Sequence, residues 1–487
     1  MTLGLFEILI FGVAALLYLL LPGRLRGWAL LAGSVIAIYW LQPPLPIRFS
    51  DFIFPTATLV LTIAAWWFSR RPDDPAQQAT RPEDRRTVLL ILGLVLLLAL
   101  NRYLEADLRL TASRPPNPLF LFIGLAISTL FFAGLAWFAR RREWRQAQTW
   151  FIFIILILFV ILKTEPLATF FAARWRGLVG QDMTLAGVID LNWLGFSYVA
   201  FRLIHTLRDR QSGILPVLSL REYVTYVIFF PSFIAGPIDR AERFTGDFRA
   251  LPALVRGDPS RFTLAATRIG IGLFKKFVIA DTLAQGMALD AVNVQQTTTT
   301  AGLWLLLYGY AFRLYFDFGG YTDIAIGIGI LFGIKLPENF NRPYLRTNIT
   351  TFWQSWHITL SDFARFYVFT PLSRQLLRRK PRPSTPLIIF IAHMATMLTI
   401  GLWHGVSGHF FIWGVWHGLA LFAHKMWSDR TRKWYRDLQA RPGPRRAWGV
   451  FTWFLTFQYV VIGWVWFVVP DVGLAARTLG RLFGIGW

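Results

Sequence analysis

The chain of 487 residues contains no cysteine. Disulfides, thiolate metal sites and a cysteine acyl-enzyme are therefore excluded, and a nucleophile or base must come from His, Ser, Thr, Tyr, Asp or Glu. The sequence also lacks a phosphate-binding glycine loop, a Gly-x-Ser-x-Gly elbow and a His-Glu-x-x-His motif. A nucleotide-driven pump thereby loses its main support, and we expect no bound metal or other cofactor.

Charge is scarce and apolar residues are abundant. Only 16% of the residues are charged and 55% are hydrophobic, with 44 Phe and 22 Trp. A soluble domain of this size needs far more polar surface, so the composition predicts an all-α polytopic membrane protein. Apolar runs long enough to cross about 30 Å of hydrocarbon recur along the chain and predict about 11–14 membrane segments. They lie near 4–21, 27–42, 52–68, 87–100, 118–138, 149–162, 185–204, 222–238, 264–284, 300–316, 320–334, 387–403, 409–427 and 447–469.

One of these runs is interrupted by Pro231, Gly236 and Pro237. Irregular backbone is tolerated at membrane depth only where protein or enclosed water satisfies it. We therefore expect a re-entrant or broken helix here.

The net charge of +23 is explained by the orientation of the chain in the membrane. Arginine-rich loops at 24–26, 70–86, 140–145, 374–382 and 430–446 mark the cytoplasmic side, because Lys and Arg accumulate there. This pattern puts the N-terminus outside the cytoplasm, with the first apolar stretch retained as a helix. Membrane lipids are expected partners and nucleic acid is not.

Polar residues are distributed unevenly. Residues 1–184 are nearly featureless apolar spans, which we interpret as N-terminal transmembrane helices. From 185 to 430 polar and Gly residues appear inside the spans, where they are costly and mark function, so we place the catalytic core there. Residues 431–487 are expected to be a cytoplasmic basic loop and a C-terminal transmembrane helix.

Six of the seven histidines lie between His357 and His424. Imidazole is polar and titrates near neutral pH, so several histidines in a low-dielectric region are expensive unless they have a function. We expect the chemistry in this segment.

Several motifs of this segment resemble the membrane-bound O-acyltransferase family. They are LFGIKLPENFNRPY at 331–344, ITTFWQSWHITLS at 349–361, GLWHG at 401–405 and WGVWHG at 413–418, with GPIDR at 236–240 and GLFKK at 272–276 upstream. The chain is similar to the bacterial branch of teichoic acid D-alanyl transferases and alginate-type O-acetyltransferases. It departs from the family at Gln354 and Ser355, where two Arg are usual, and at Phe366, where an Asp is usual.

The resemblance implies roles for two histidines. His404 corresponds to the histidine that the family treats as catalytic, and we assign it general base. His357 corresponds to the second motif histidine, which would orient the acceptor or donate to the oxyanion. The alternative is that both are hydrogen-bonded core histidines.

Further residues are candidates for the substrate tunnel: Trp353, Trp403, Asn339, Asn341, Arg342 and His417. The Asn and Arg residues fit a satisfied turn equally well, and His417 fits a core position. His205, His393, His409 and His424 are interpreted as structural. Asp317 and Asp323 either border the cavity or pair with Arg313 or Lys335.

The expected function is acyl transfer, of acetyl or D-alanyl, from a cytoplasmic thioester to a hydroxyl of an envelope or secreted polymer. The resemblance implies acyl-CoA or an acylated carrier protein as donor, and an acyltransferase partner outside the cytoplasm. Two other classes stay open. One is a polysaccharide exporter or flippase without chemistry, and the other is a haem-binding membrane electron carrier.

Overall fold

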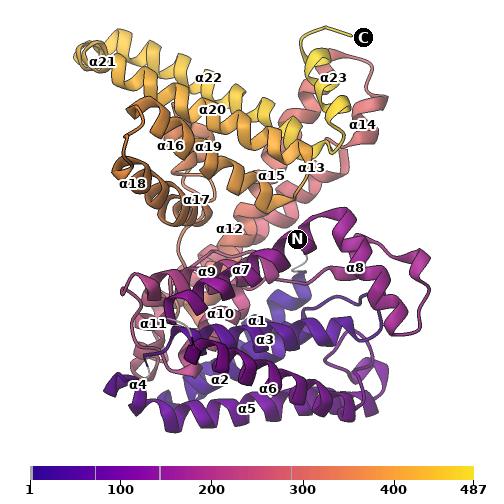
Figure 1. The fold of residues 1–487 in the computed structure, drawn as a ribbon. Coiled ribbons are helices and arrows are strands. Elements are labelled where there is room, and N and C mark those ends of the chain that lie inside the picture. The colour runs from indigo at the N-terminus through magenta and orange to yellow at the C-terminus, as the bar shows by residue number, and fades with distance from the viewer. Residues whose placement is uncertain (1–3, 72, 142–143, 287, 487) are drawn as a thin grey trace. The chain divides into compact units, whose positions relative to one another are not determined.

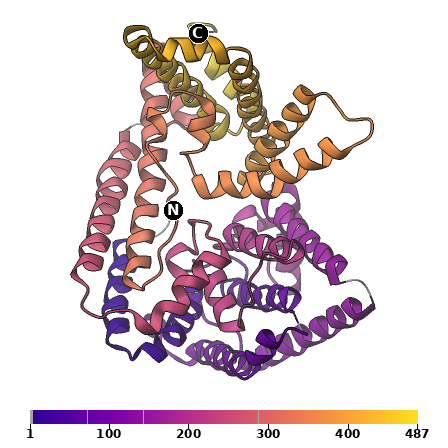
Figure 2. The ribbon, with the colours of Figure 1, turned by 90° about the vertical axis from the view of Figure 1, so that its left-hand side faces the viewer.

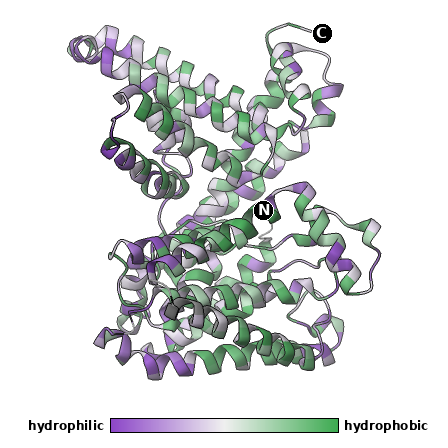
Figure 3. Ribbon diagram, in the orientation of Figure 1, coloured by the Kyte–Doolittle hydropathy of each residue, from purple (hydrophilic) through white to green (hydrophobic). Residues whose placement is uncertain are grey.

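The computed structural model describes residues 4–71, 73–141, 144–286 and 288–486 (Figure 1). Within these residues the secondary structure is helical, with one isolated antiparallel bridge between Phe340 and Trp356. Apolar residues run through most of the helices (Figure 3). The predicted all-α fold is confirmed.

The chain forms two compact units, Met1–Thr267 with Ala325–Pro337, and Arg268–Ile324 with Glu338–Trp487. Two helices, α12 (Pro259–Leu273) and α15 (Thr300–Leu331), run from one unit into the other. The division expected from the sequence, into 1–184, 185–430 and 431–487, stays a prediction. The two compact units are defined by packing and do not test a division by function.

The first unit is built from crossing helices, drawn from indigo to magenta (Figures 1 and 2). Its helices are α1 (Leu5–Leu20), α2 (Gly23–Trp40), α3 (Ser50–Ser69), α4 (Pro75–Ala79), α5 (Arg81–Leu100), α6 (Pro118–Arg141), α7 (Trp144–Lys163), α8 (Glu165–Leu178), α9 (Phe196–Gln211), α10 (Leu220–Ile228) and α11 (Ala241–Ala250).

The second unit holds all the motif histidines. Its helices are α13 (Asp281–Gly286), α14 (Ala291–Gln296), α16 (Ile349–Trp353), α17 (Ile358–Ala364), α18 (Thr370–Arg378), α19 (Thr385–His404), α20 (Gly408–Arg430), α21 (Arg432–Gln439), α22 (Pro442–Val468) and α23 (Val472–Leu482). Two π-helical turns, Phe274–Ala280 and Arg365–Phe369, interrupt the regular geometry.

Five described helical segments are long and apolar enough to cross a membrane: Ser50–Ser69, Arg81–Tyr103, Trp144–Lys163, Thr385–His404 and Pro442–Val468. Leu5–Leu20 is a shorter apolar helix, as is the stretch Pro118–Phe131. The protein is thus a multi-pass membrane protein by its helices. The number of segments stays a prediction, since length and composition do not decide which of the other helices span.

The expected break after 228 is confirmed. Helix α10 ends at Ile228 and the chain continues as a short 3₁₀ turn, Phe230–Ser232. The guanidinium of Arg202, fully buried, donates to the carbonyl oxygens of Val227 at 2.6 Å and Ser232 at 2.8 Å. The irregular backbone is therefore satisfied by a protein side chain, as membrane depth requires.

Two expected boundaries were wrong. The spans 300–316 and 320–334 form one helix, α15, because the Gly pair at 319–320 serves close packing and not a turn. The span expected at 185–204 becomes helical only at Phe196, after Gly195 in a left-handed conformation (φ 73°). Before it, Asp190 forms a buried ion pair with Arg176 that holds 3₁₀ turns in place.

Helices α19 and α20 pack closely along their lengths. Small residues permit this: a side chain on Gly401 would place its Cβ 2.5 Å from the carbonyl oxygen of Phe410, and one on Gly414 would lie 2.9 Å from that of Met397. Small residues at such contacts are typical of membrane helix pairs. This packing fixes His404, at the end of α19, and His417, in the middle of α20.

Candidate functional site

His357 occupies a strained backbone position. It is the N-cap of α17 with φ 43°, a left-handed conformation that is uncommon for residues other than Gly, Asn and Asp. The neighbouring backbone is held by the bridge between Phe340 and Trp356 and by the Ile358 amide, which donates to the Asn339 carbonyl at 2.9 Å. Its ring is buried, with its centroid 4.7 Å from that of Phe318 and 5.9 Å from that of Trp403.

His404 is the last residue of α19, as its apolar span and Gly405 indicated. Its side chain is half-buried. The imidazole contacts the rings of Trp403 at 4.6 Å, Phe467 at 4.7 Å and Trp413 at 5.7 Å between centroids. A half-buried imidazole at a helix end can be reached by a substrate, which a base requires.

His417 is fully buried within α20. Its ring centroid lies 4.8 Å from Trp413 and 5.2 Å from Trp353, and Tyr459 lies at 6.2 Å. The other neighbour expected from the sequence, Trp416, stacks instead on Tyr459. His417 is therefore enclosed by aromatic rings.

Two tryptophans connect the three histidines. The indole of Trp403 contacts both His357 and His404, and the indole of Trp413 contacts both His404 and His417. The structure thus brings the candidates of 353–357, 403–404 and 417 into one continuous cluster inside the second unit.

Buried polar atoms gather in this cluster. Within the described part of the chain, no hydrogen-bond partner is found for Nε2 of His357, either ring nitrogen of His417, or the indole nitrogens of Trp353 and Trp413. Buried polar groups are normally hydrogen-bonded, and exceptions occur at functional sites. The cluster therefore offers several donors and acceptors to a polar substrate in apolar surroundings.

The remaining histidines are held by hydrogen bonds. His393 Nδ1 pairs with the Ile389 carbonyl at 2.9 Å, and His409 Nδ1 with that of Trp466 at 3.0 Å. His424 Nδ1 lies 2.9 Å from Thr350 Oγ1, and His205 Nδ1 lies 3.1 Å from Tyr226 Oη. These contacts support the structural interpretation of all four.

The polar loop before α16 has an inner and an outer part. Asn339 is buried, and its Oδ1 accepts a hydrogen bond from Thr359 Oγ1 at 2.7 Å. Asn341 and Arg342 are exposed. Only Asn339 thus lies in the protein interior beside His357, while the other two candidates face outward.

Of the two alternatives for Asp317 and Asp323, the one that paired them with Arg313 or Lys335 was wrong. Asp317 pairs with Lys276 at 2.7 Å, and Asp323 pairs with Arg268 and Lys275, both at 2.6 Å. The acids therefore do not pair with Arg313 or Lys335 as expected. The π-helical turn that begins at Phe274 carries both lysines and could not be read from the sequence.

The sequence placed Trp413 near His417 but gave no sign of two other aromatic residues of the cluster, Phe318 and Phe467. Trp413 stands four residues before His417, a spacing that puts both on one helical face. That signal was present for Trp413, whereas Phe318 and Phe467 come from distant helices. Among the residues that the structure describes, no group of three or more His, Asp or Glu side chains is placed to hold a metal ion.

Comparison with known proteins now decides the family. A family model described as "MBOAT, membrane-bound O-acyltransferase family" matches residues 120–465, which include His357, His404 and His417. The chain belongs to this family. Acyl transfer is the chemistry that the family name states, and the all-helical membrane fold agrees with it.

Relatives with three named activities are similar to this chain. The probable alginate O-acetylase AlgI of Pseudomonas syringae pv. tomato is 33% identical over 375 residues, 75% of this chain and 66% of the relative. The peptidoglycan O-acetyltransferase of Helicobacter pylori is 36% identical over 290 residues, 57% of this chain and 52% of the relative. The teichoic acid D-alanyltransferase of Streptococcus thermophilus is 29% identical over 329 residues, which are 65% of this chain and 74% of the relative.

The matched part covers between about half and two thirds of the length of five O-acetylase relatives, from 52% to 66%. The family membership of this chain stands on the family model. Substrate, donor and partners do not follow from it.

Proposed function

We propose that this protein transfers an acyl group, acetyl or D-alanyl, from a cytoplasmic thioester to a hydroxyl of an envelope or secreted polymer. The observation that carries the proposal is the cluster of His357, His404 and His417 around Trp403 and Trp413, within the segment that matches the acyltransferase family. The donor is acyl-CoA or an acyl carrier protein. The acceptor is reached directly or through an acyltransferase outside the cytoplasm.

The reaction needs one base. His404 takes the proton of the acceptor hydroxyl as its oxygen attacks the thioester carbon. A C–O bond forms, the C–S bond breaks, and the imidazolium returns the proton to the leaving thiolate. His404 is half-buried and His357 is 3% exposed. The more accessible ring therefore suits the base, and the buried one suits orientation of the acceptor or donation to the oxyanion.

The aromatic walls suit the chemistry as well. Trp353, Trp403, Trp413 and Phe467 surround the imidazoles with apolar surface. A water-poor site limits hydrolysis of the thioester and strengthens hydrogen bonds to the developing charge.

The test is thiol release by the purified protein. Because the chain has no cysteine, a thiol-reactive dye reports only thiol released from acetyl-CoA or acetyl-pantetheine in the presence of de-acetylated cell polysaccharide. We expect His404→Ala to lower acceptor-dependent thiol release by about 10²–10⁴-fold, the usual contribution of a general base.

His393→Ala is the matched control. It lies on the same helix, and its ring nitrogen bonds the Ile389 carbonyl. This variant should retain most of the activity. Substantial turnover by His404→Ala would remove His404 from the role of base. A polymer exporter would show no acceptor-dependent thiol release in any form of the protein, and a haem carrier would show a visible absorbance band after purification.

A further inference from the structure

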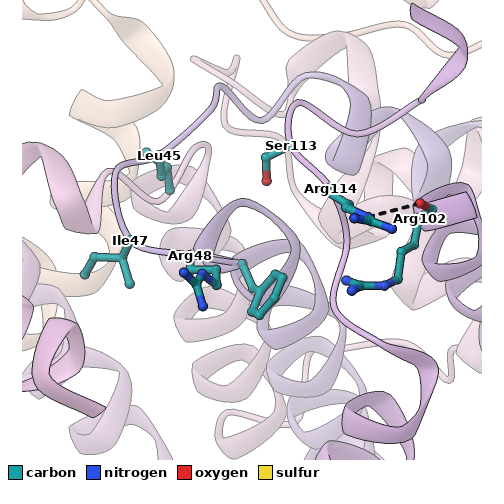
Figure 4. Close-up of a pocket in the computed structure, with 7 residues that line it drawn as sticks. Leu45, Ile47, Arg48, Arg102, Ser113 and Arg114 are labelled. Carbon is teal, nitrogen blue, oxygen red and sulfur yellow. Dashed lines mark hydrogen bonds between the residues drawn. The ribbon is translucent and has the colours of Figure 1, made fainter. Parts of the chain in front are cut away.

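A second site lies in the first unit, far along the chain from the histidines. A cavity of about 380 Å³ opens where the segment between α2 and α3 meets the segment between α5 and α6 (Figure 4). Both the amide and the hydroxyl of Ser113 donate to the carboxylate of Asp51 at 2.8 Å, which ties the two segments together. The lining residues are Leu45, Ile47, Arg48, Phe49, Arg102, Ser113 and Arg114.

Three guanidinium groups converge on this cavity, those of Arg48, Arg102 and Arg114. None of the three forms an ion pair with any residue that the structure describes. Arg102 donates to the Pro115 carbonyl at 2.8 Å, and Arg114 donates to the Arg102 carbonyl at 3.3 Å. The carboxylate of Asp51, which follows Phe49 on α3, accepts two hydrogen bonds from Ser113. The cavity is therefore a region of uncompensated positive charge.

These three arginines lie on the predicted outer side of the membrane, where short loops carry few arginines. Helices α3 and α5 have one end at this cavity and the other at the arginine-rich loop 70–86. If that loop is cytoplasmic, the cavity faces outside, where short loops normally carry few Lys or Arg. Orientation therefore does not explain the three arginines, and a local ligand does.

The depth of the cavity follows from its neighbours. Tyr103, Leu104, Leu108 and Leu110, which follow Arg102 directly, expose between 42% and 67% of their surface. An apolar segment exposed to this degree is typical of residues in contact with the acyl boundary of a membrane. Exposed apolar side chains of this kind beside the cavity would bring lipid within reach of its arginines.

We propose that this cavity binds the phosphate of an anionic phospholipid. Guanidinium groups match phosphate oxygens with paired hydrogen bonds. Leu45 and Phe49, both partly exposed, supply apolar surface for the glycerol and the first acyl carbons. Phe49 holds a left-handed backbone (φ 67°), rare for an aromatic residue and typical of functional segments, and it caps the N-terminus of α3, which favours an anion.

The test compares two lipids on the purified protein in detergent. We expect dioleoyl-phosphatidylglycerol, and not dioleoyl-phosphatidylcholine, to raise the Tm of the wild type by several degrees and to stay bound in native mass spectrometry. The double variant Arg48→Gln with Arg114→Gln should bind phosphatidylglycerol at least tenfold more weakly.

Arg109→Gln is the matched control. It removes the same charge from the same segment, but Arg109 does not line the cavity and its Nε donates to the Leu104 carbonyl. It should keep the full response. Arg114→Lys keeps the charge and loses the paired geometry, so it should give an intermediate shift and serves if the double variant does not fold.

Three outcomes would overturn the proposal. The first is an equal phosphatidylglycerol response in the double variant and the wild type. The second is an arginine-dependent Tm shift given by an oligouronate and not by the lipid, which would assign the cavity to an acidic glycan. The third is a full response to inorganic phosphate alone, which would make the ligand a free anion.

Discussion

At the residue scale, His357 combines chemistry with backbone strain. A left-handed conformation at a residue other than Gly, Asn or Asp costs free energy and persists only where the surroundings enforce it. Here the pairing of 339–341 with 355–358 enforces it, through the Asn341 amide on the Ser355 carbonyl and the Ile358 amide on the Asn339 carbonyl. The strain aims the ring at Trp403, which also contacts His404.

Substitutions at His357 separate the role of its imidazole in catalysis from the strain of its left-handed backbone. Asn tolerates the left-handed region, so His357→Asn should leave the Tm unchanged while lowering kcat for acyl transfer at least tenfold. Val does not tolerate it, so His357→Val should lower the free energy of unfolding by about 1–3 kcal/mol. Thermal unfolding and thiol release measure the two effects. Wild-type kcat in His357→Asn would remove the imidazole from the site.

At the element scale, the crossing of α12 and α15 depends on two glycines. A Cβ on Gly272 would lie 2.7 Å from the Gly320 carbonyl oxygen, and a Cβ on Gly320 would lie 2.8 Å from the Gly272 carbonyl oxygen. This close approach lets Lys276 reach Asp317 and Lys275 reach Asp323. Phe318, next to Asp317, then contacts His357. One crossing thus supports the ion pairs and one wall of the site.

Gly320→Ala should separate the two helices. Because its Cβ meets backbone atoms, which cannot rotate away, the substitution should destabilise the protein by about 1–3 kcal/mol. Gly270→Ala is the matched control, since a Cβ at that position on α12 meets nothing within 4 Å. Thermal unfolding of both variants in the same detergent measures the difference, and an equal Tm would mean that the crossing tolerates a wider spacing.

At the scale of the whole molecule, orientation decides which substrate reaches the site from which side. In the proposed reaction the donor comes from the cytoplasm and the acceptor lies outside. The predicted topology puts the arginine-rich loops and the cavity of Arg48, Arg102 and Arg114 on opposite sides. The contacts between Ser113 and Asp51 show that the segments after α2 and α5 share one side of the first unit.

Single cysteines test this orientation without interference, because the chain has none of its own. Cysteines replacing Gln78, Gln146 and Ala440, in or directly beside three arginine-rich segments, should resist an impermeant maleimide in intact cells and react after permeabilisation. A cysteine replacing Ala112 should react in intact cells. Outside labelling at any of the first three positions would reverse the expected donor side.

The sequence by itself determined the class of the protein and the region of the site. Composition and apolar run length are sufficient for a helical membrane protein, since hydrocarbon accepts only helices or closed barrels. The break after Ile228 was visible because Pro and Gly act locally. The cost of imidazole in apolar surroundings pointed to the segment 357–424, and the family motifs within it singled out His357 and His404.

Only the tertiary structure decided which of these residues meet. The sequence suggested two spans separated near 317–319, yet these residues lie inside one helix, where Gly320 packs against Gly272 on α12. The partners of Asp317 and Asp323 depend on a π-helical turn, and Trp413 joins His404 to His417 only because α19 and α20 pack closely. Pairings between distant segments arise from packing, which local sequence patterns do not specify.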